Sequence, residues 1–311
     1  MRRSPPLSFT ASLPRVKPFR VLLVYLAAVF LGAAALAPWV YLGVQHLAPG
    51  SGIAHQPFHR YVNRCLLVLA LGGLWPLVRA MGLKSWAEIG WKPRKTWFRE
   101  VGNGLGLGFL SLALATVAAR VFGGRIWRAD HTAAEWAKHL LGATATAILV
   151  ACLEELLFRG AVFSALRRTK SFAFALAVSS GVYALVHFFE RPAPPSSVDS
   201  FTGFAVLAQM LRGFTDVHEL IPGFLTLTLA GGLLAWARER TGALWFSFGL
   251  HAGWIFWLKS YGFLTTAAPS AKSELWGTAK LYDGWAALLV LTLVAVAWRR
   301  RWRIHSPAPA V

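Results

Sequence analysis

The sequence predicts an all-α polytopic membrane protein with about eight transmembrane helices. Of its 311 residues, 56% are hydrophobic and only 14% are charged, and the mean hydropathy is +0.50, a profile that excludes an ordinary soluble domain. The apolar residues form separate stretches near the ~20 residues that a helix needs to cross a bilayer. We expect the spans at about 21–45, 60–80, 101–122, 138–166, 171–189, 220–237, 243–262 and 282–298.

The charge balance indicates a lipid surface as the partner and no nucleic acid. Lys and Arg number 32 against 13 Asp and Glu, but they fall in short clusters between the apolar stretches. With both termini inside, the inner segments hold 20 of them and the outer segments 11, which follows the positive-inside rule. We therefore expect an integral protein of the bacterial cytoplasmic (inner) membrane, with its N- and C-termini in the cytoplasm.

Four smaller features are interpreted as structural. For the first span, a cleaved signal peptide is the alternative, because 33–37 consists of small residues. The connector 82–99 is polar and amphipathic, and 201–214 is short enough to be an interfacial or re-entrant helix. Small residues allow close helix contact, and the third span carries Gly102, Gly104, Gly106 and Gly108. The two cysteines, Cys65 and Cys152, lie in apolar spans and indicate no disulfide framework.

Two adjacent carboxylates and a cation interrupt the fourth span. Each ionisable group at membrane depth costs at least ~2.5–3.5 kcal/mol, so Glu154, Glu155 and Arg159 require an explanation. On a helix, Glu155 and Arg159 are i,i+4 neighbours and can pair, whereas Glu154 points about 100° away. One carboxylate thus has a local partner and the other does not.

Two histidines, His187 and His251, lie well within predicted spans. A carboxylate and an imidazole together can hold and deprotonate a water molecule, and low polarity strengthens hydrogen bonds to a developing oxyanion. Three other interpretations of these residues remain open: a plain buried ion pair that fixes helix packing, a proton or cation relay in a transporter, and a metal site. No His-Glu-x-x-His signature supports a metalloprotease helix.

The order and spacing of these residues resemble the three motifs of the CPBP family, which comprises the type II CAAX prenyl proteases and the bacteriocin-processing, or ABI, membrane proteins. The resemblance covers about 135–260. It is carried by Glu154, Glu155 and Arg159, then by Tyr183 and His187, and then by Gly231, the run Thr241–Trp245, and His251.

The resemblance implies a type II CAAX protease-like bundle acting as an intramembrane endopeptidase. Glu154 would be the general base, and His187 would help it to activate water. Glu155 with Arg159 would hold the geometry of the site, and His251 would help to stabilise the oxyanion. The chain then divides into a basic cytoplasmic tail (1–20), N-terminal transmembrane helices (21–130), the catalytic core (131–262), and a last transmembrane helix with a basic C-terminal tail (263–311).

Two positions depart from the family pattern. Tyr183 replaces the usual Phe, which keeps an aromatic ring and adds a hydroxyl donor. Ile255 stands where the third motif usually has Asn or Asp, so an amide donor is missing. Loss of one oxyanion donor costs about 2.7–4 kcal/mol in other enzymes. Ser247, four residues before His251 on the same helical face, is the candidate substitute.

We therefore expect a glutamate-type endopeptidase that hydrolyses a membrane-associated or lipidated peptide or protein. We expect no cofactor. If the reaction needs a divalent metal such as zinc, then Glu154, His187 and His251 are the candidate ligands. The first alternative is a catalytically weak or inactive family member that acts as a membrane scaffold or immunity-type protein, which Ile255 favours. The second is an ion- or proton-coupled transporter.

Overall fold

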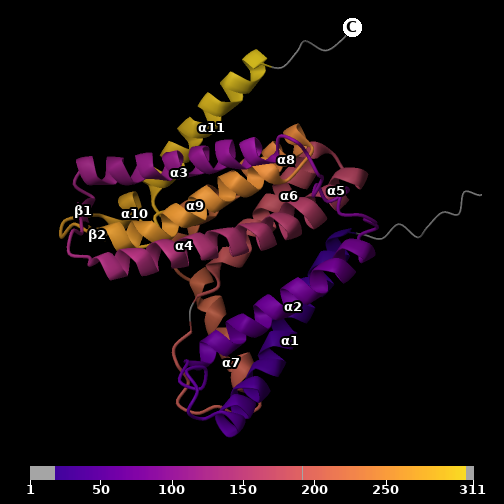
Figure 1. Ribbon diagram of the computed structural model, residues 1–311, viewed down its shortest axis with the longest axis vertical. Helices are drawn as coiled ribbons and strands as arrows, with labels where there is room; N and C mark the ends of the chain where they lie inside the picture. Colours follow the sequence, from indigo (N-terminus) through magenta and orange to yellow (C-terminus); the bar gives the residue numbers. More distant parts are fainter. Residues whose placement is uncertain (1–17, 191, 306–311) are drawn as a thin grey trace, which may run out of the picture.

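A computed structural model describes residues 18–190 and 192–305, with the side chains of 219 and 301–305 left out (Figure 1). The chain is almost entirely helical, which confirms the predicted class. The helices are α1 (Pro18–Leu47), α2 (Phe58–Ala80), α3 (Trp97–Val121), α4 (Ala133–Glu154), η1 (Glu155–Phe163), α5 (Ser164–Thr169), α6 (Phe172–Leu185), η2 (Val186–Phe188), α7 (Thr202–Met210), η3 (Leu211–Phe214), α8 (Val217–Thr241), α9 (Trp245–Leu264), α10 (Ser273–Trp276) and α11 (Trp285–His305).

Every predicted span is helical. Among the described residues, five segments are long and apolar enough to cross a membrane: 18–47, 58–80, 97–121, 133–169 and 220–241. A shorter apolar helix covers 172–188, and α9 and α11 cover the last two predicted spans without belonging to that group of five. The protein is therefore a polytopic membrane protein.

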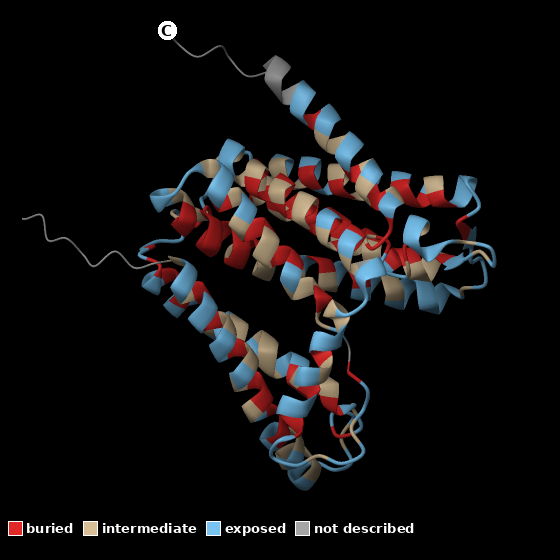
Figure 2. Cartoon of the chain, turned by 180° about the vertical axis from the view of Figure 1, so that it is seen from behind, coloured by how far each residue is buried: buried red, intermediate tan, exposed pale blue. Residues whose placement is uncertain are grey.

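The helices form two regions, which we call the N-terminal lobe and the bundle (Figure 1). The lobe consists of α1, α2 and α7, and the bundle of the helices from α3 to α11 other than α7. Buried residues run through the interior of the bundle, whereas the lobe helices expose much of their length (Figure 2). In the lobe, the ring of Tyr41 meets those of Phe58 and Tyr61 edge-on, at centroid distances of 5.6 and 5.1 Å.

Glycines on both partners allow α3 and α9 to lie in close contact. A Cβ atom added at Gly104 or Gly108 would collide with the backbone of α9, and one at Gly249 or Gly253 would collide with the backbone of α3. The predicted role of the glycine run is thus confirmed for two of its members. Nothing lies within 4 Å of the Cβ position at Gly102 or Gly106, so those two glycines do not serve this contact.

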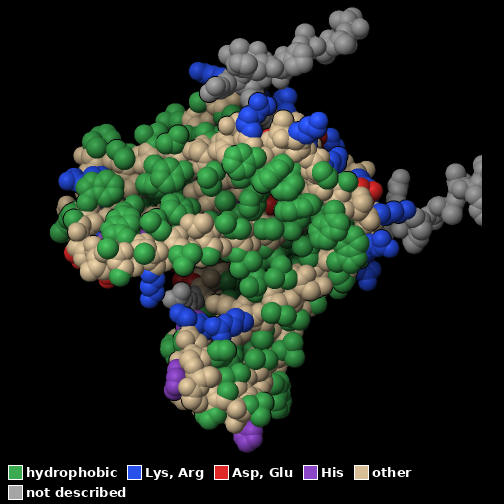
Figure 3. Space-filling model, viewed as in Figure 1, with side chains coloured by type: hydrophobic (Ala, Val, Ile, Leu, Met, Phe, Trp, Pro, Cys, Tyr) green, Lys and Arg blue, Asp and Glu red, His purple; other side chains and the backbone are tan. Residues whose placement is uncertain are grey.

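Side-chain types are distributed over the surface as the bilayer requires. Hydrophobic side chains cover the flank of the bundle, and Lys and Arg gather at the end where α3 begins and α8 ends (Figure 3). Ion pairs at that end join Arg167 to Glu239 and Arg168 to Glu88, each at 2.9 Å. The predicted inner segments around 82–99, 167–170 and 238–242 therefore share one end of the bundle, while the orientation of that end stays a prediction.

Four local features differ from the predictions or refine them. A two-stranded antiparallel sheet, β1 (Arg125–Trp127) with β2 (Thr265–Ala267), joins the ends of α3 and α9 and was not predicted, because each strand has only three residues. The segment around 201–214 is helical and lies against the middle of α1, where Gly203 touches the Ala34 backbone. Both cysteines are free. Helix α1 continues unbroken through 33–37.

The predicted terminal tails fall largely outside the described residues. Residues 1–17 and 306–311 are not described, so the tail at 1–20 is covered only from Pro18, which begins α1. At the other end, the helix does not stop at the predicted residue 298. It continues as α11 through the arginine cluster to His305, so part of the expected basic tail is helical.

Candidate active site

A π-helical segment carries the charged residues of the fourth span. The sequence predicts one α-helix over 138–166, but the chain changes at Glu155 into η1, which runs to Phe163. Such wide turns are rare and occur frequently at functional sites. Gly160 lies in this segment, where a Cβ atom would come within 3.2 Å of the Ile89 carbonyl oxygen. The 82–99 connector thus lies close against this glycine, and a side chain there would require the connector to shift by a few tenths of an ångström.

Glu155 and Arg159 form a buried ion pair. Their side chains are each 1% exposed, and Arg159 Nη1 lies 3.2 Å from Glu155 Oε1, as the i,i+4 spacing predicts. Arg159 Nη2 donates to the Gly231 carbonyl at 3.4 Å, and its guanidinium carbon lies 4.3 Å from the centroid of the Tyr183 ring. Removing one partner of such a pair leaves an uncompensated buried charge, which typically costs 3–5 kcal/mol.

His251 extends this pair into a chain of polar contacts. Its Nδ1 lies 3.0 Å from Glu155 Oε1, so it donates its proton to that carboxylate. In the neutral ring Nε2 is then an acceptor, and the Tyr183 hydroxyl donates to it at 3.2 Å. Since His251 is only 3% exposed, this chain fixes the ring in one orientation.

Glu154 faces the other edge of this cluster. Its Oε2 lies 3.6 Å from His251 Nε2 and 3.7 Å from His187 Nε2, and it accepts no hydrogen bond from any described residue. His187 Nδ1 donates to the Tyr183 carbonyl at 2.7 Å, which leaves its Nε2 as an acceptor. A carboxylate oxygen and two imidazole nitrogens, all acceptors, therefore converge on one place.

These atoms open onto a largely apolar cavity of about 80 Å³. Glu154, Tyr183, His187 and His251 share its wall with apolar side chains from α3, α4, α8, α9 and α11. A second cavity of about 460 Å³ lies on the other side of His187 and is lined by charged residues, among them Glu190 and Lys280. Both cavities touch His187, so the cluster stands between an apolar space and a polar one.

Most of the predicted site residues lie together in the structure, but Ser247 does not line the cavity. Glu154, Glu155, Arg159, Tyr183, His187 and His251 come together from three distant parts of the sequence. Ser247 is fully buried, donates to the Leu244 carbonyl at 3.1 Å and does not line the cavity, whereas Ile255 does. The prediction that Ser247 replaces the missing amide thus gains no support from its position.

Two wall residues with a hydroxyl group were not predicted. Tyr282, just before α11, and Thr226 of α8 both line the Glu154 cavity. Thr226 lies in the apolar sixth span and donates its hydroxyl to the Pro222 carbonyl, a common arrangement in any helix. No sequence signal distinguishes either residue, because each reaches the cavity only through the packing of α8 and α11 against the other helices.

The cluster can be tested as a metal site from its own geometry. Within the described part of the chain, no group of three or more His, Cys, Asp and Glu side chains is arranged to hold a metal ion. Glu154, His187 and His251 converge, but as placed they do not form a closed set of ligands. No step of the chemistry below is therefore assigned to a metal.

Comparison with protein families agrees with the motifs. Residues 135–257 match the family described as type II CAAX prenyl endopeptidase Rce1-like. Over this segment the chain is similar to the Rce1-like family. The match contains all three motifs with Glu154, His187 and His251, and it ends two residues after Ile255. It leaves out α1, α2 and α3, as the sequence resemblance does. No curated protein matches the chain.

Proposed function

We propose that the protein is an intramembrane endopeptidase that hydrolyses a peptide bond with a water molecule activated by Glu154 and His187. Similarity to the Rce1-like family supports the reaction class. The observation that carries the proposal is the position of Glu154 Oε2, buried and 3.6–3.7 Å from two imidazole Nε2 atoms. Two acceptors at that separation can each receive one hydrogen of the same water molecule.

In the proposed step, Glu154 takes one proton from the water while its oxygen attacks the carbonyl carbon of the peptide bond. The tetrahedral intermediate then breaks the C–N bond, and the proton passes from Glu154 to the leaving amine. The products are a carboxyl and an amino terminus, with water consumed. A positioned general base of this kind typically contributes 10²–10⁴-fold to the rate. The step as written needs no metal ion.

Tyr183 and His251 are the candidate donors for the oxyanion. The Tyr183 hydroxyl lies on the cavity wall and becomes a donor when its hydrogen turns from His251 Nε2 to the oxyanion. His251 Nε2 can donate only in a ring that has taken up a second proton from solvent, and that imidazolium would remain 3.0 Å from the Glu155 carboxylate. Glu155 and Arg159 act as positioning residues. Glu155 binds His251, Arg159 binds Glu155, and neither residue lines the cavity in which the reaction would take place. This assignment gives the hydroxyl of Tyr183 a role that the usual Phe cannot have.

The substrate we propose is a membrane-associated or lipidated peptide. The Glu154 cavity has mainly apolar walls formed by membrane-spanning helices, which suits an apolar or lipid-bearing segment, and the neighbouring charged cavity suits the polar end of a peptide. The description of the matched family names CAAX prenyl endopeptidases, and we extend that substrate chemistry to this chain as part of the proposal.

The test is cleavage of lipidated and transmembrane peptides by the purified protein in liposomes, with and without a chelator. We expect wild type to cleave, Glu154→Gln to lose at least a hundredfold in kcat while remaining folded, and chelator to have no effect. Glu274→Gln, a change of the same kind at an exposed glutamate, is the matched control and should cleave normally. Full activity of Glu154→Gln would contradict the proposal, and inhibition by chelator would contradict its metal-free form.

A scaffold function is the second candidate, and Ile255 is the observation that favours it. An apolar side chain occupies the cavity wall where the family usually places an amide. If the chain is a protease framework without a complete oxyanion site, wild type should not cleave and Ile255→Asn should gain activity in the same liposomes. Cleavage by wild type that depends on Glu154 would rule the scaffold out.

A further inference from the structure

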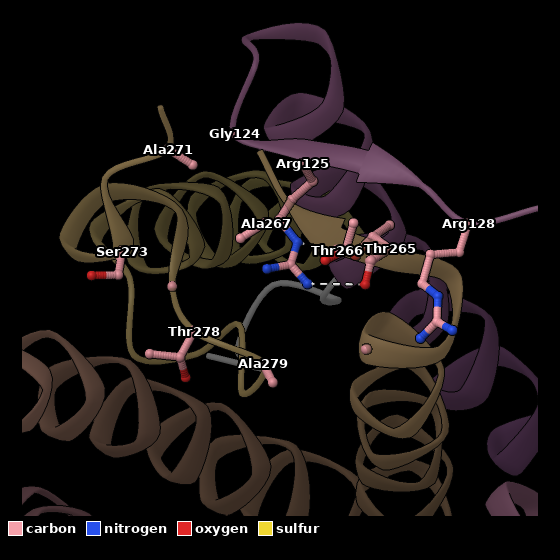
Figure 4. A pocket seen from close by; sticks show the side chains of 12 residues that line it. Gly124, Arg125, Arg128, Thr265, Thr266, Ala267, Ala271, Ser273, Thr278 and Ala279 are labelled. Atoms are coloured by element: carbon pink, nitrogen blue, oxygen red, sulfur yellow. Dashed lines mark hydrogen bonds between the residues drawn. The ribbon is translucent and has the colours of Figure 1, made fainter. Parts of the chain in front are cut away.

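A third cavity lies at the end of the bundle where α3 and α9 finish, and it shares no lining residue with the Glu154 cavity (Figure 4). It has a volume of about 350 Å³ and is lined by residues from three segments: Gly124, Arg125 and Arg128; Gly262 and Thr265–Ala267; and Ala271, Ser273 and Gly277–Ala279. The β1–β2 pairing brings the first two segments together, with Arg125 opposite Ala267 and Trp127 opposite Thr265. None of the lining residues is acidic.

Arg125 supplies a buried positive charge to this cavity. Only 5% of the residue is exposed. Its Nε donates to Thr265 Oγ1 and its Nη2 to the Thr265 carbonyl, both at 3.1 Å, and its guanidinium carbon lies 4.5 Å from the Tyr261 ring centroid. All of these partners are neutral. Within the part of the chain that the structure describes, Arg125 forms no ion pair, and a buried charge without a counter-charge is costly.

Further donors surround Arg125. Arg128 also lines this cavity, with Thr265 and Thr266 between the two arginines in the view of Figure 4. Arg128 Nε lies 3.7 Å from Asp130, but the Arg128 side chain is 42% exposed, so it can turn toward a ligand. Asp283, a buried carboxylate beside the Thr278 side of the wall, accepts from the Thr278 hydroxyl and amide. The cavity is thus a site for an anion.

The surroundings of the cavity place it at the depth of lipid headgroups. Exposed aromatic residues ring this end of the bundle: Phe122 is 73% exposed and Trp127 46%, and the Phe122 ring stacks on Trp276. Such aromatic belts mark the interface between the acyl chains and water. The anion most abundant at that depth is the phosphate of a phospholipid, which guanidinium groups bind through paired, charge-assisted hydrogen bonds.

We propose that this cavity binds the phosphate of an anionic phospholipid headgroup, with Arg125 as a fixed ligand and Arg128 as a mobile one. The site is independent of peptide hydrolysis, since none of its residues lines the Glu154 cavity. Its occupation would fix the β1–β2 connection and so stabilise the α3–α9 pair.

The experiment is native mass spectrometry and thermal melting of the full chain in neutral detergent, with phosphatidylglycerol, phosphatidylcholine or inorganic phosphate added. We expect retained phosphatidylglycerol and a raised melting temperature, with little effect of phosphatidylcholine. Arg128→Gln and Arg125→Gln should each bind phosphatidylglycerol about tenfold more weakly, the loss expected for one charge-assisted contact. The matched control is Arg120→Gln, an exposed arginine at the same end outside the cavity, which should bind as wild type does.

Three results would overturn the proposal. The first is equal binding of the anionic and zwitterionic lipids. The second is unchanged binding in Arg128→Gln, a variant that keeps the test valid even if Arg125→Gln fails to fold. The third is stabilisation by inorganic phosphate equal to that by the lipid, which would assign the site to a free anion.

Discussion

The N-terminal lobe and the bundle are both made of apolar helices, but they are held together differently. In the lobe, contacts are aromatic and aliphatic, and the Tyr61 hydroxyl donates to the Ile53 carbonyl at 2.6 Å near the tip of the lobe. Glycine contacts with a neighbouring backbone occur in both regions, at Gly203 against Ala34 in the lobe and between α3 and α9 in the bundle. Among the described residues, a buried ion pair that fixes the position of a histidine occurs in the bundle and not in the lobe. The difference indicates that the orientation of polar side chains is fixed most strictly in the bundle.

The largest effect should come from filling the glycine contact between α3 and α9. Gly108→Ala places a Cβ atom against the Leu250 carbonyl, next to His251, so the helices must separate. We expect a destabilisation of ~1–3 kcal/mol and a loss of cleavage. Gly106→Ala is the control: its Cβ meets nothing within 4 Å, and alanine favours the helix. Thermal melting and cleavage rates measured on both variants check this, and equal behaviour would contradict the close contact.

Removing one tyrosine hydroxyl from the bundle and one from the lobe should separate an effect on catalysis from an effect on stability. Tyr183→Phe loses the hydrogen bond to His251 Nε2, and we expect kcat to fall about tenfold or more, with a smaller change in melting temperature. Tyr61→Phe loses the bond to the Ile53 carbonyl, which should cost ~1 kcal/mol of stability and leave kcat unchanged. A reduced kcat in Tyr61→Phe with Tyr183→Phe unaffected would reverse our division of roles.

The smallest effect concerns the connector between the two regions. Glu88 accepts a hydrogen bond from the Lys84 amide and pairs with Arg168 at 2.9 Å; these contacts hold the pKa of its carboxyl below the ordinary value of 4.5. Because the folded pKa is the lower one, this stabilisation is present above pH 4.5 and is lost as the pH falls through the folded pKa. For an exposed pair it amounts to at most ~1 kcal/mol.

Glu88→Gln should therefore melt slightly below wild type at neutral pH, and the difference should vanish in acid. High salt should reduce it as well, since exposed charges are screened. Melting curves of both proteins between pH 3 and 7 measure this. A melting-temperature difference that grows in acid would be opposite to the expected change and would show that Glu88 does not stabilise the connector between lobe and bundle.

The sequence was sufficient for the spans and for most of the cluster. Apolar length located the helices, and the i,i+4 spacing of Glu155 and Arg159 predicted their pairing. It did not reveal the change to a π-helix at Glu155, because the apolar periodicity of the span is the same for an α-helix and for one wide turn. It also missed Tyr282, because that residue reaches the cavity through the packing of α11, which no local pattern encodes. For Ser247, helical periodicity gave the correct face but not the direction of its hydroxyl.

Helices α3 and α9 are joined twice, by glycine contacts along their length and by the β1–β2 pair at one end. Because the two helices are in contact along their length and again at one end, they resist both sliding along each other and separating. We therefore expect α3 and α9 to move as one rigid body. His251 belongs to α9 and so to this rigid pair, whereas Glu154 and His187 lie on other helices. Admission of a long peptide must then be accommodated by the elements packed against the α3–α9 pair, such as α4, α8 and α11. The His251 imidazole would then keep its position, and Glu154 and His187 would move toward it when the site closes around a peptide.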